Sequence, residues 1–194
     1  MDLAHVHEGT RLLDLATGTG DLAFLAFPRV GHTGVVVGLD ITWRMLELAA
    51  TKRKGGRPHF VRGDMLALPF PDASFDVITT GYGIRNVPIL ERALDEIARV
   101  VRPGGRFFSL DFDRPANPVL RTVYLGYLTI IGSTFGLLLH RDPDTYRYIP
   151  ASLREYPGSE QIAQMLRARG FKHTRVIPVL GSLMAIHSAC RIDD

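Results

Sequence analysis

Cysteine is nearly absent from this sequence. Cys190 is the single cysteine among 194 residues, so the chain cannot form an internal disulfide. Proteins without disulfides are typical of the reducing cytoplasm. The sequence also shows no basic segment followed by an apolar one at its start, so no secretory signal is visible. We therefore expect a cytoplasmic protein.

Lysine and clustered basic charge are also scarce. The lysines are Lys52, Lys54 and Lys172, and the arginines are scattered apart from a short cluster at 52–57. That cluster could touch a phosphate, but the end of a helix is the commoner setting for such cations. No basic stripe is interleaved with aromatic residues, so we expect no nucleic-acid partner. Cysteine and histidine do not cluster at the spacing of metal ligands, so we expect no metal.

Charge is missing altogether from residues 122–139. On length alone such a stretch is a candidate for a transmembrane helix. It contains several glycines, threonines and tyrosines, however, and charged or titratable residues bracket it closely at 121, 140 and 141. We interpret it as a buried or lid helix that touches a bilayer surface at most, not as a span.

What is present is an alternation of strand and helix patterns in a chain of one-domain size. Apolar runs predict strands at 11–16, 34–40, 59–62, 75–80, 106–112, 172–177 and 183–189. Helical spacing of apolar residues predicts helices at 21–27, 43–53, 89–101 and 159–169, the third ending at Pro103-Gly104-Gly105. The alternation implies an α/β domain with a parallel sheet, and Gly181 suits the turn of a C-terminal antiparallel hairpin. We expect a single domain over 1–194, with a proline-rich insertion at 113–157 that covers the site.

A glycine turn follows the first predicted strand, in the segment Asp14-Leu-Ala-Thr17-Gly18-Thr-Gly20. Glycines there let the backbone approach a ligand, but the same pattern occurs in nicotinamide-binding proteins. The discriminating residue is Asp14, because a carboxylate beside this turn would repel a pyrophosphate and attract a cationic amino-acid group. S-adenosylmethionine carries an ammonium and a sulfonium and no phosphate, so it fits better. The alternative is a solvated turn acid.

Two further strand ends carry acidic residues. Asp40 closes the run GVVVGLD, where a carboxylate can accept two ribose hydroxyls. Its alternative role is to cap the next helix. Ile41 and Met45 follow, and Met45 could pack on adenine, although core filling is the commoner fate of a methionine.

Asp64 and Met65 follow the third predicted strand. The Asp64 carboxylate can accept the adenine amino hydrogen, and the Met65 amide can donate to a ring nitrogen. Thr80 lies at the end of the fourth predicted strand, where small residues leave room for a methyl group and its acceptor.

Several longer motifs resemble the ubiquinone/menaquinone C-methyltransferase family. They are LLDLATGTGDLA, GLDIT followed by ML, DMLALPFPDASFDVITTGYGIRNV, ARVVRPGGRFFSLDFDRP, DTYRYIPASLREYPG and MAIHSA, and the resemblance covers about residues 10–190. It implies a Rossmann-like class I fold, a mostly parallel seven-stranded sheet with helices on both faces. It also implies S-adenosylmethionine as cofactor, S-adenosylhomocysteine as product, and C-methylation of a prenylated quinol. Family members usually carry an extra helical segment before the first strand, whereas here Leu12 lies close to the start of the sequence.

A carbon acceptor must first become electron-rich, which calls for a base and for a cation that stabilises a phenolate. Arg85 is the candidate cation and Asn86 a candidate orienting group. Their alternatives are pairing of Arg85 with an acid and capping by Asn86 of the helix near Pro88. Asp111, at the end of the fifth predicted strand, is expected to face the pocket.

His187 and His140 are candidate bases, because imidazole titrates near neutral pH. For His187, in an apolar strand, the alternative is a hydrogen-bonded core histidine. Tyr146, Arg147 and Tyr148 could line a substrate wall or simply pack.

Other readings stay open. The acceptor could be another small lipophilic molecule, or the chain could be a catalytically weak S-adenosylmethionine-binding protein, or a nicotinamide oxidoreductase. If the acceptor is lipophilic, we expect peripheral contact with the inner face of the membrane. A homodimer is also compatible with the sequence.

Overall fold

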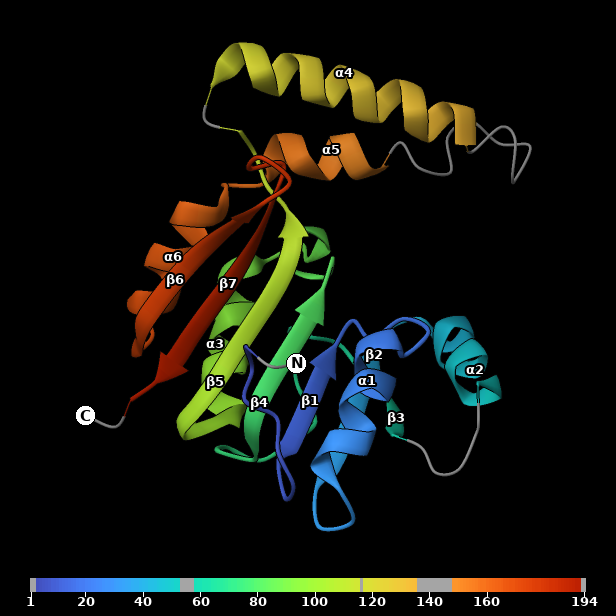
Figure 1. Cartoon of the computed structure of the whole chain (residues 1–194), viewed down its shortest axis with the longest axis vertical. Coiled ribbons are helices and arrows are strands. Elements are labelled where there is room, and N and C mark those ends of the chain that lie inside the picture. The colour runs from blue at the N-terminus through green and yellow to red at the C-terminus, as the bar shows by residue number, and fades with distance from the viewer. Residues whose placement is uncertain (1–2, 53–57, 116, 136–147, 193–194) are drawn as a thin grey trace.

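The computed structural model describes residues 3–52, 58–115, 117–135 and 148–192. Seven strands form one sheet in the order β3-β2-β1-β4-β5-β7-β6 (Figure 1). The pairings of β7 with β5 and with β6 are antiparallel, and the other described pairings are parallel. The strands are β1 (Arg11–Leu15), β2 (Val35–Asp40), β3 (His59–Arg62), β4 (Phe75–Gly81), β5 (Val101–Phe112), β6 (Phe171–Val179) and β7 (Met184–Arg191). The predicted parallel sheet with a C-terminal antiparallel hairpin is confirmed.

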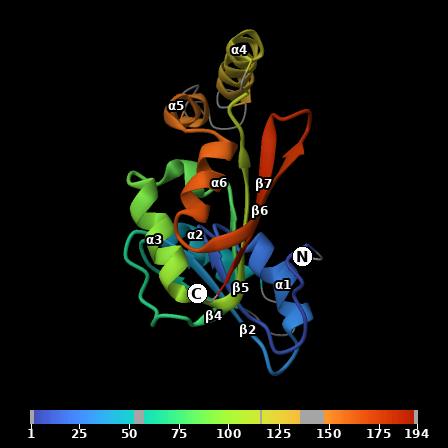
Figure 2. The ribbon, with the colours of Figure 1, turned by 90° about the vertical axis from the view of Figure 1, so that its left-hand side faces the viewer.

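Helices cover both faces of the sheet, also as predicted. Figure 2 shows α3 and α6 on one face and α1 on the other. The helices are α1 (Asp21–Val30), α2 (Trp43–Thr51), the 3-10 turn η1 (Ile84–Asn86), α3 (Leu90–Val100), α4 (Pro118–Phe135), α5 (Tyr148–Glu155) and α6 (Ser159–Arg167).

The alternating side chains of β1 supply both layers of the core. Leu12 belongs to a buried cluster with Ala23 of α1, whereas Leu13 and Leu15 belong to the larger cluster that includes Ile97 of α3. Because β1 is covered on both faces, its leucines Leu12, Leu13 and Leu15 are all fully buried. The parallel register then brings the carboxyl ends of β1, β2 and β4 to one edge of the sheet.

One predicted boundary is wrong. The helix predicted at 89–101 is α3 (Leu90–Val100), but β5 begins at Val101 and not at the predicted residue 106, so Pro103-Gly104-Gly105 lie within the strand. The pairing of β5 with β4 shifts register between Phe75 and Val77. The proline and glycines are therefore accommodated as an irregularity near the start of a strand, where a missing N–H is tolerated.

The insertion between β5 and α6 forms α4 and α5, which lie side by side beyond the carboxyl ends of β4 and β5 (Figure 1). Among the residues that the structure describes, no helix combines the length and apolar character needed to cross a membrane.

Candidate active site

A cavity of about 460 Å³ opens at the carboxyl ends of β1, β2 and β4, within the size range of small-molecule sites. In open α/β sheets this edge is where ligands bind. The lining residues come from the turns after these strands and from η1: Ala16, Gly18, Leu39, Asp40, Ile41, Thr42, Met45, Gly63, Asp64, Met65, Gly81, Tyr82, Gly83, Asn86, Val87 and Pro88. Seven predicted site residues are among them: Gly18, Asp40, Ile41, Met45, Asp64, Met65 and Asn86.

Asp40 ties two turns together at the floor of this cavity. Its Oδ2 accepts the Gly18 N–H at 2.8 Å, and its Oδ1 accepts the Thr42 N–H at 2.8 Å. A carboxylate offers about four lone-pair directions, so both oxygens can still accept hydroxyls from a ligand. The predicted ribose contact therefore stays open to Asp40, whereas the alternative role as helix cap is not realised, because Thr42 is the N-cap residue of α2 and no side chain caps that end.

Asp14 lies deeper than predicted. Its carboxylate is buried and accepts hydrogen bonds from the hydroxyls of Thr17 at 2.5 Å and Thr79 at 2.7 Å. Burial raises the pKa of Asp14 from 3.8 to about 6, although these hydroxyls act in the opposite direction. Neither Asp14 nor Thr17 is among the cavity-lining residues described here. Direct contact of Asp14 and Thr17 with a cofactor stays a prediction. In the structure these two residues shape the glycine turn.

The two glycines of that turn differ in role. Gly18 lines the cavity at φ +55, with open space where a Cβ would stand. Gly20 has φ +81, and a Cβ there would lie 2.8 Å from the ring of Phe60. Gly20 therefore allows close packing at the start of α1 and is not among the residues that line the cavity, so its contact with a cofactor stays a prediction.

Apolar side chains stand exposed at one wall. Ile41 is 61% exposed and Met45 is 41% exposed, whereas Met65 is buried at the base. Asp64 Oδ1 accepts the Leu66 N–H at 2.9 Å, which folds the 64–67 turn. Exposed apolar groups beside two carboxylates suit a flat base attached to a polar sugar.

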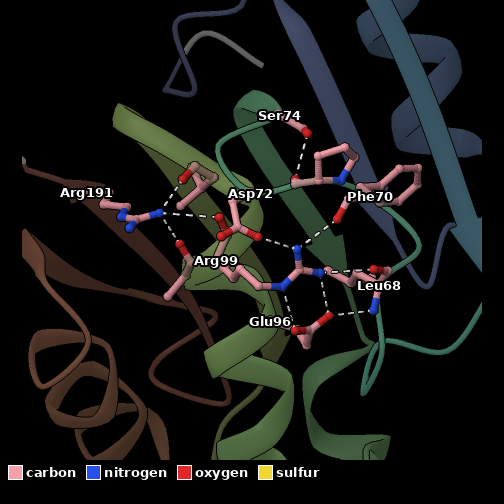
Figure 3. A network of polar contacts seen from close by, with 10 residues as sticks. Leu68, Phe70, Asp72, Ser74, Glu96, Arg99 and Arg191 are labelled. Atoms are coloured by element: carbon pink, nitrogen blue, oxygen red, sulfur yellow. Dashed lines mark hydrogen bonds and ion pairs between the residues drawn. The ribbon is translucent and has the colours of Figure 1, made fainter.

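A polar network fixes the loop that continues from this wall (Figure 3). Arg99 of α3 donates to the carbonyl oxygens of Leu68 at 3.0 Å and Phe70 at 2.8 Å, and to the carboxylates of Glu96 and Asp72 at 2.8 Å. Glu96 in turn accepts the Leu68 N–H at 2.6 Å. The planar guanidinium thereby holds the 68–72 loop against α3.

The turn after β4 closes another side of the cavity. Gly83 has no room for a side chain, because a Cβ would lie 2.5 Å from Thr80 Oγ1. Thr80 is buried, and within the described part of the chain its hydroxyl has no hydrogen-bond partner. A buried hydroxyl without a protein partner, next to a lining residue, is available to a ligand.

Arg85 and Asp111 form a buried ion pair behind this turn. Arg85 Nε lies 2.8 Å from Asp111 Oδ1, and the Arg85 backbone N–H donates to Oδ2 at 3.2 Å. Arg85 also donates to Ser152 Oγ of α5 at 2.7 Å and to Asn86 Oδ1 at 3.2 Å. Burial raises the pKa of Asp111, and the charge of Arg85 opposes that shift. The predicted alternative for Arg85, pairing with an acid, is therefore realised.

A second cavity of about 410 Å³ adjoins the first. Asn86, Val87 and Pro88 line both, and Asn86 is fixed by donating to the Tyr82 carbonyl oxygen at 2.9 Å. The remaining lining residues of the second cavity come from η1, α3 and the end of α5: Ile84, Arg85, Leu90, Ser152, Glu155, Tyr156 and Pro157.

His187 does not reach either of these cavities. Its Nδ1 lies 2.8 Å from Ser109 Oγ, and its Nε2 lies 2.8 Å from the Ser159 carbonyl oxygen. The carbonyl can only accept, so Nε2 carries the hydrogen and Nδ1 accepts from the serine. Burial lowers the pKa of His187, which keeps it neutral. The geometry matches the core-histidine alternative, and no described contact supports a role as base.

Some sequence expectations lie outside the described residues, namely those for His140, Tyr146 and Arg147; for Tyr148 only the backbone is described. Other lining residues were missed. Ser152, Glu155 and Tyr156 lie in the motif DTYRYIPASLREYPG but were not singled out, because only the fold brings α5 to η1. Tyr82 carried one weak signal, since it lies between two glycines after a strand.

Solved structures share this fold. A SAM-dependent methyltransferase from Aquifex aeolicus superposes with a TM-score of 0.70 at 19% identity, over 98% of this chain and 87% of that one. An S-adenosylmethionine-dependent methyltransferase from Mesorhizobium loti gives a TM-score of 0.71 at 17% identity, over 98% and 94%. The chain therefore shares the fold of these methyltransferases.

Sequence comparison narrows the class. A model of the ubiE/COQ5 methyltransferase family matches residues 1–191. The chain is 43% identical over 185 residues to the ubiquinone/menaquinone biosynthesis C-methyltransferase UbiE of Methylobacterium nodulans, covering 94% of this chain and 73% of that protein. It is 35% identical over 190 residues to the demethylmenaquinone methyltransferase of Listeria welshimeri, covering 96% and 80%. The chain therefore belongs to the ubiE/COQ5 methyltransferase family, and its cofactor is S-adenosylmethionine.

The residues of the first cavity fit that cofactor. Its described lining holds two carboxylates, Asp40 and Asp64, and no basic side chain. Such a lining suits a positively charged, phosphate-free nucleoside and disfavours a dinucleotide pyrophosphate. Asp64 therefore adds to the discrimination that the sequence assigned to Asp14, whereas Asp40 suits the ribose of either cofactor.

Proposed function

We propose that this enzyme transfers a methyl group to a ring carbon of a prenylated quinol, of the demethylmenaquinol or ubiquinol-precursor type. The names of the relatives support a quinol acceptor. The single observation that carries the proposal is the wall shared by two cavities. Asn86 lines both, so an acceptor ring in the second cavity can meet a methyl donor in the first.

In this arrangement the first cavity holds the cofactor through the residues predicted from the sequence. Asp40 accepts the ribose hydroxyls, Ile41 and Met45 cover the adenine, and Asp64 and Met65 bind its edge. Gly18 keeps the floor open for the amino-acid part. When bound, S-adenosylmethionine supplies a methyl group on a positively charged sulphur and leaves as S-adenosylhomocysteine.

The chain's own chemistry concerns the acceptor. Loss of a phenolic proton to water places electron density on the ortho carbon, which forms the new carbon–methyl bond as the sulphur–methyl bond breaks. The ring proton then leaves to solvent and aromaticity returns. Arg85 lines the second cavity and stabilises the phenolate, while Asn86 orients it. Asp111 is a positioning residue, since it holds the Arg85 side chain.

The direct test is an acceptor assay with the full chain. Labelled S-adenosylmethionine is offered with short-chain demethylmenaquinol, with the corresponding benzoquinol, and with both in their oxidised quinone forms. We expect a ring-methylated product from at least one quinol and none from the quinones, which lack the phenolic proton. An O-methylated product, or turnover only of another lipophilic acceptor, would contradict the proposal.

A matched variant separates binding from chemistry. Asn86→Asp keeps the size of the side chain, removes the donor to the Tyr82 carbonyl oxygen and adds negative charge where the phenolate would form. We expect quinol turnover to fall on the order of a hundredfold, while binding of S-adenosylhomocysteine is retained. A thermal shift with S-adenosylhomocysteine against NADH gives the control, and binding without turnover of any quinol by the parent chain would favour a cofactor-binding protein.

The acceptor's prenyl tail needs an apolar path, and we place it at the α4–α5 insertion, as a lid next to the second cavity. The exposed side of α4 carries Val119, Val123, Tyr127 and Ile130 at helical spacing. Arg121 is the only charged residue of α4, and its positive charge suits anionic headgroups. These features support peripheral contact of the α4 stripe (Val119, Val123, Tyr127 and Ile130) with the inner face of the membrane.

Vesicle flotation tests this contact. The parent chain should float with anionic vesicles, and Val123→Glu with Ile130→Glu should abolish flotation without changing binding of S-adenosylhomocysteine. Light scattering, which measures the oligomeric state, tests the alternative that a second copy of the chain covers the stripe. A dimer that the same two substitutions split would assign the stripe to a second copy of the chain instead.

A further inference from the structure

The backbone of Tyr82 adopts an unusual conformation beside the cofactor cavity. Its φ is +58, in the left-handed region that bulky side chains rarely occupy. Neighbouring contacts impose this shape, because the Tyr82 N–H donates to the Leu110 carbonyl oxygen at 2.8 Å and its own carbonyl accepts from Asn86 at 2.9 Å. Glycine would adopt the same φ without strain, as it does at Gly18, where φ is +55.

The strained turn presents a large aromatic ring. Tyr82 lines the cofactor cavity and is 43% exposed, so core packing does not account for it. Its ring centroid lies 5.3 Å from that of Phe112, which in turn carries the Arg85 guanidinium 5.2 Å from its centroid. The exposed ring is therefore braced from behind by Phe112 and Arg85.

Strain held in place by surrounding contacts often marks a functional site. The carbonyl of Tyr82 is bound by Asn86, the side chain that lines both cavities. Tyr82 therefore lines the first cavity directly beside Asn86, at the junction where that cavity adjoins the second. A partly exposed, braced aromatic ring at that junction offers a face on which another aromatic ring can stack.

We infer that Tyr82 determines acceptor specificity by stacking on the aromatic ring to be methylated. This inference rests on the proposed quinol function and adds a residue to it. The backbone strain is the cost of placing a ring where glycine would fold more easily. Tyr82 takes no proton in this role, so the ring is required and the hydroxyl is not.

The test compares Tyr82→Gly, Tyr82→Leu and Tyr82→Phe in the full chain. Glycine relieves the strained φ, so the Tyr82→Gly variant should unfold at the same temperature or higher. We expect the KM for the quinol to rise on the order of tenfold in Tyr82→Gly and Tyr82→Leu, the size of a lost aromatic pair. Because Tyr82 also lines the cofactor cavity, affinity for S-adenosylhomocysteine should change too, but by less than the KM for the quinol. Tyr82→Phe should restore most of the lost quinol affinity.

The matched control is His173→Gly, which relieves another positive φ (+52) at an exposed residue of β6. It should leave the KM unchanged. An unchanged KM in Tyr82→Gly, an equal loss of S-adenosylhomocysteine affinity, or failure of phenylalanine to rescue would each overturn the inference. Failure of the proposed function shows differently, since the parent chain would then turn over no quinol.

Discussion

Arg85 and Asp111 form an ion pair in which Nε and Oδ1 lie 2.8 Å apart and each side chain is only 2% exposed. The pair links η1 to the end of β5, and through Ser152 it also reaches α5. A buried charge that loses its partner is strongly destabilising, whereas replacing both partners by apolar groups is often nearly neutral.

The first prediction uses this asymmetry. Asp111→Asn should lower the free energy of unfolding by about 3 kcal/mol, because it leaves the Arg85 charge buried without its carboxylate. Arg85→Met combined with Asp111→Leu should recover most of that stability in urea denaturation. If Arg85 stabilises a phenolate, the stable double variant still binds S-adenosylhomocysteine but methylates no quinol. Full turnover by the double variant would assign the pair to structure alone.

The second prediction concerns the pH dependence of stability. Burial places the pKa of Asp14 at about 6 in the folded chain, above its ordinary value of 3.8. Between these pH values the folded chain binds a proton that the unfolded chain has released, so this group makes stability fall as pH rises. The loss of folding stability from ionising the buried Asp14 is complete above about pH 6 and amounts to about 3 kcal/mol.

Asp14→Asn removes this titration. The difference in unfolding free energy between Asp14→Asn and the parent should therefore shift in favour of the variant as pH rises from about 4 to about 7. Denaturation curves at several pH values measure that difference, in which other titrating groups cancel. A difference independent of pH would show that Asp14 does not titrate in this window.

Much of the fold could be predicted because parallel strands leave a local signature. The run GVVVGLD ends in Asp40, and the parallel register alone places that carboxylate at the ligand-binding edge. Gly18 is similar, because a glycine after a buried strand is required by the local backbone. The positions of such residues depend only on the local structure of their own segment, and the sequence pattern predicts that local structure.

Other roles depend on partners that no local pattern specifies. His187 is held by Ser109 and Ser159, which are distant in the chain, so the sequence could not separate a base from a core histidine. Ser152 reaches Arg85 only because α5 folds over η1. The positive φ of Tyr82 likewise follows from tertiary contacts.

The third prediction tests the catalytic alternative for His187. His187→Gln should lower stability by about 1–3 kcal/mol, because two buried hydrogen bonds are disturbed. Since the folded pKa of His187 lies below 6.5, the unfolded chain takes up the proton first as pH falls. The parent should therefore lose stability below about pH 6.5, and the variant should lack that part of the slope. The pH profile of quinol turnover should be unchanged, and loss of one limb of it would restore His187 as a candidate base.

The fourth prediction concerns Arg99, which holds the loop that continues from the Asp64–Met65 wall (Figure 3). Arg99→Lys keeps the charge but cannot contact Glu96 and two carbonyl oxygens at once, because an ammonium lacks the planar fork. Two or more hydrogen bonds to the loop are lost, so its amides should exchange hydrogen faster and S-adenosylhomocysteine should bind roughly tenfold more weakly. Arg102→Lys is the matched control, because Arg102 pairs with Asp76 and does not line the cofactor cavity. If both substitutions weaken S-adenosylhomocysteine binding equally, the weakening reflects general destabilisation. If only Arg99→Lys weakens it, the order of the 68–72 loop determines the shape of the Asp64–Met65 wall.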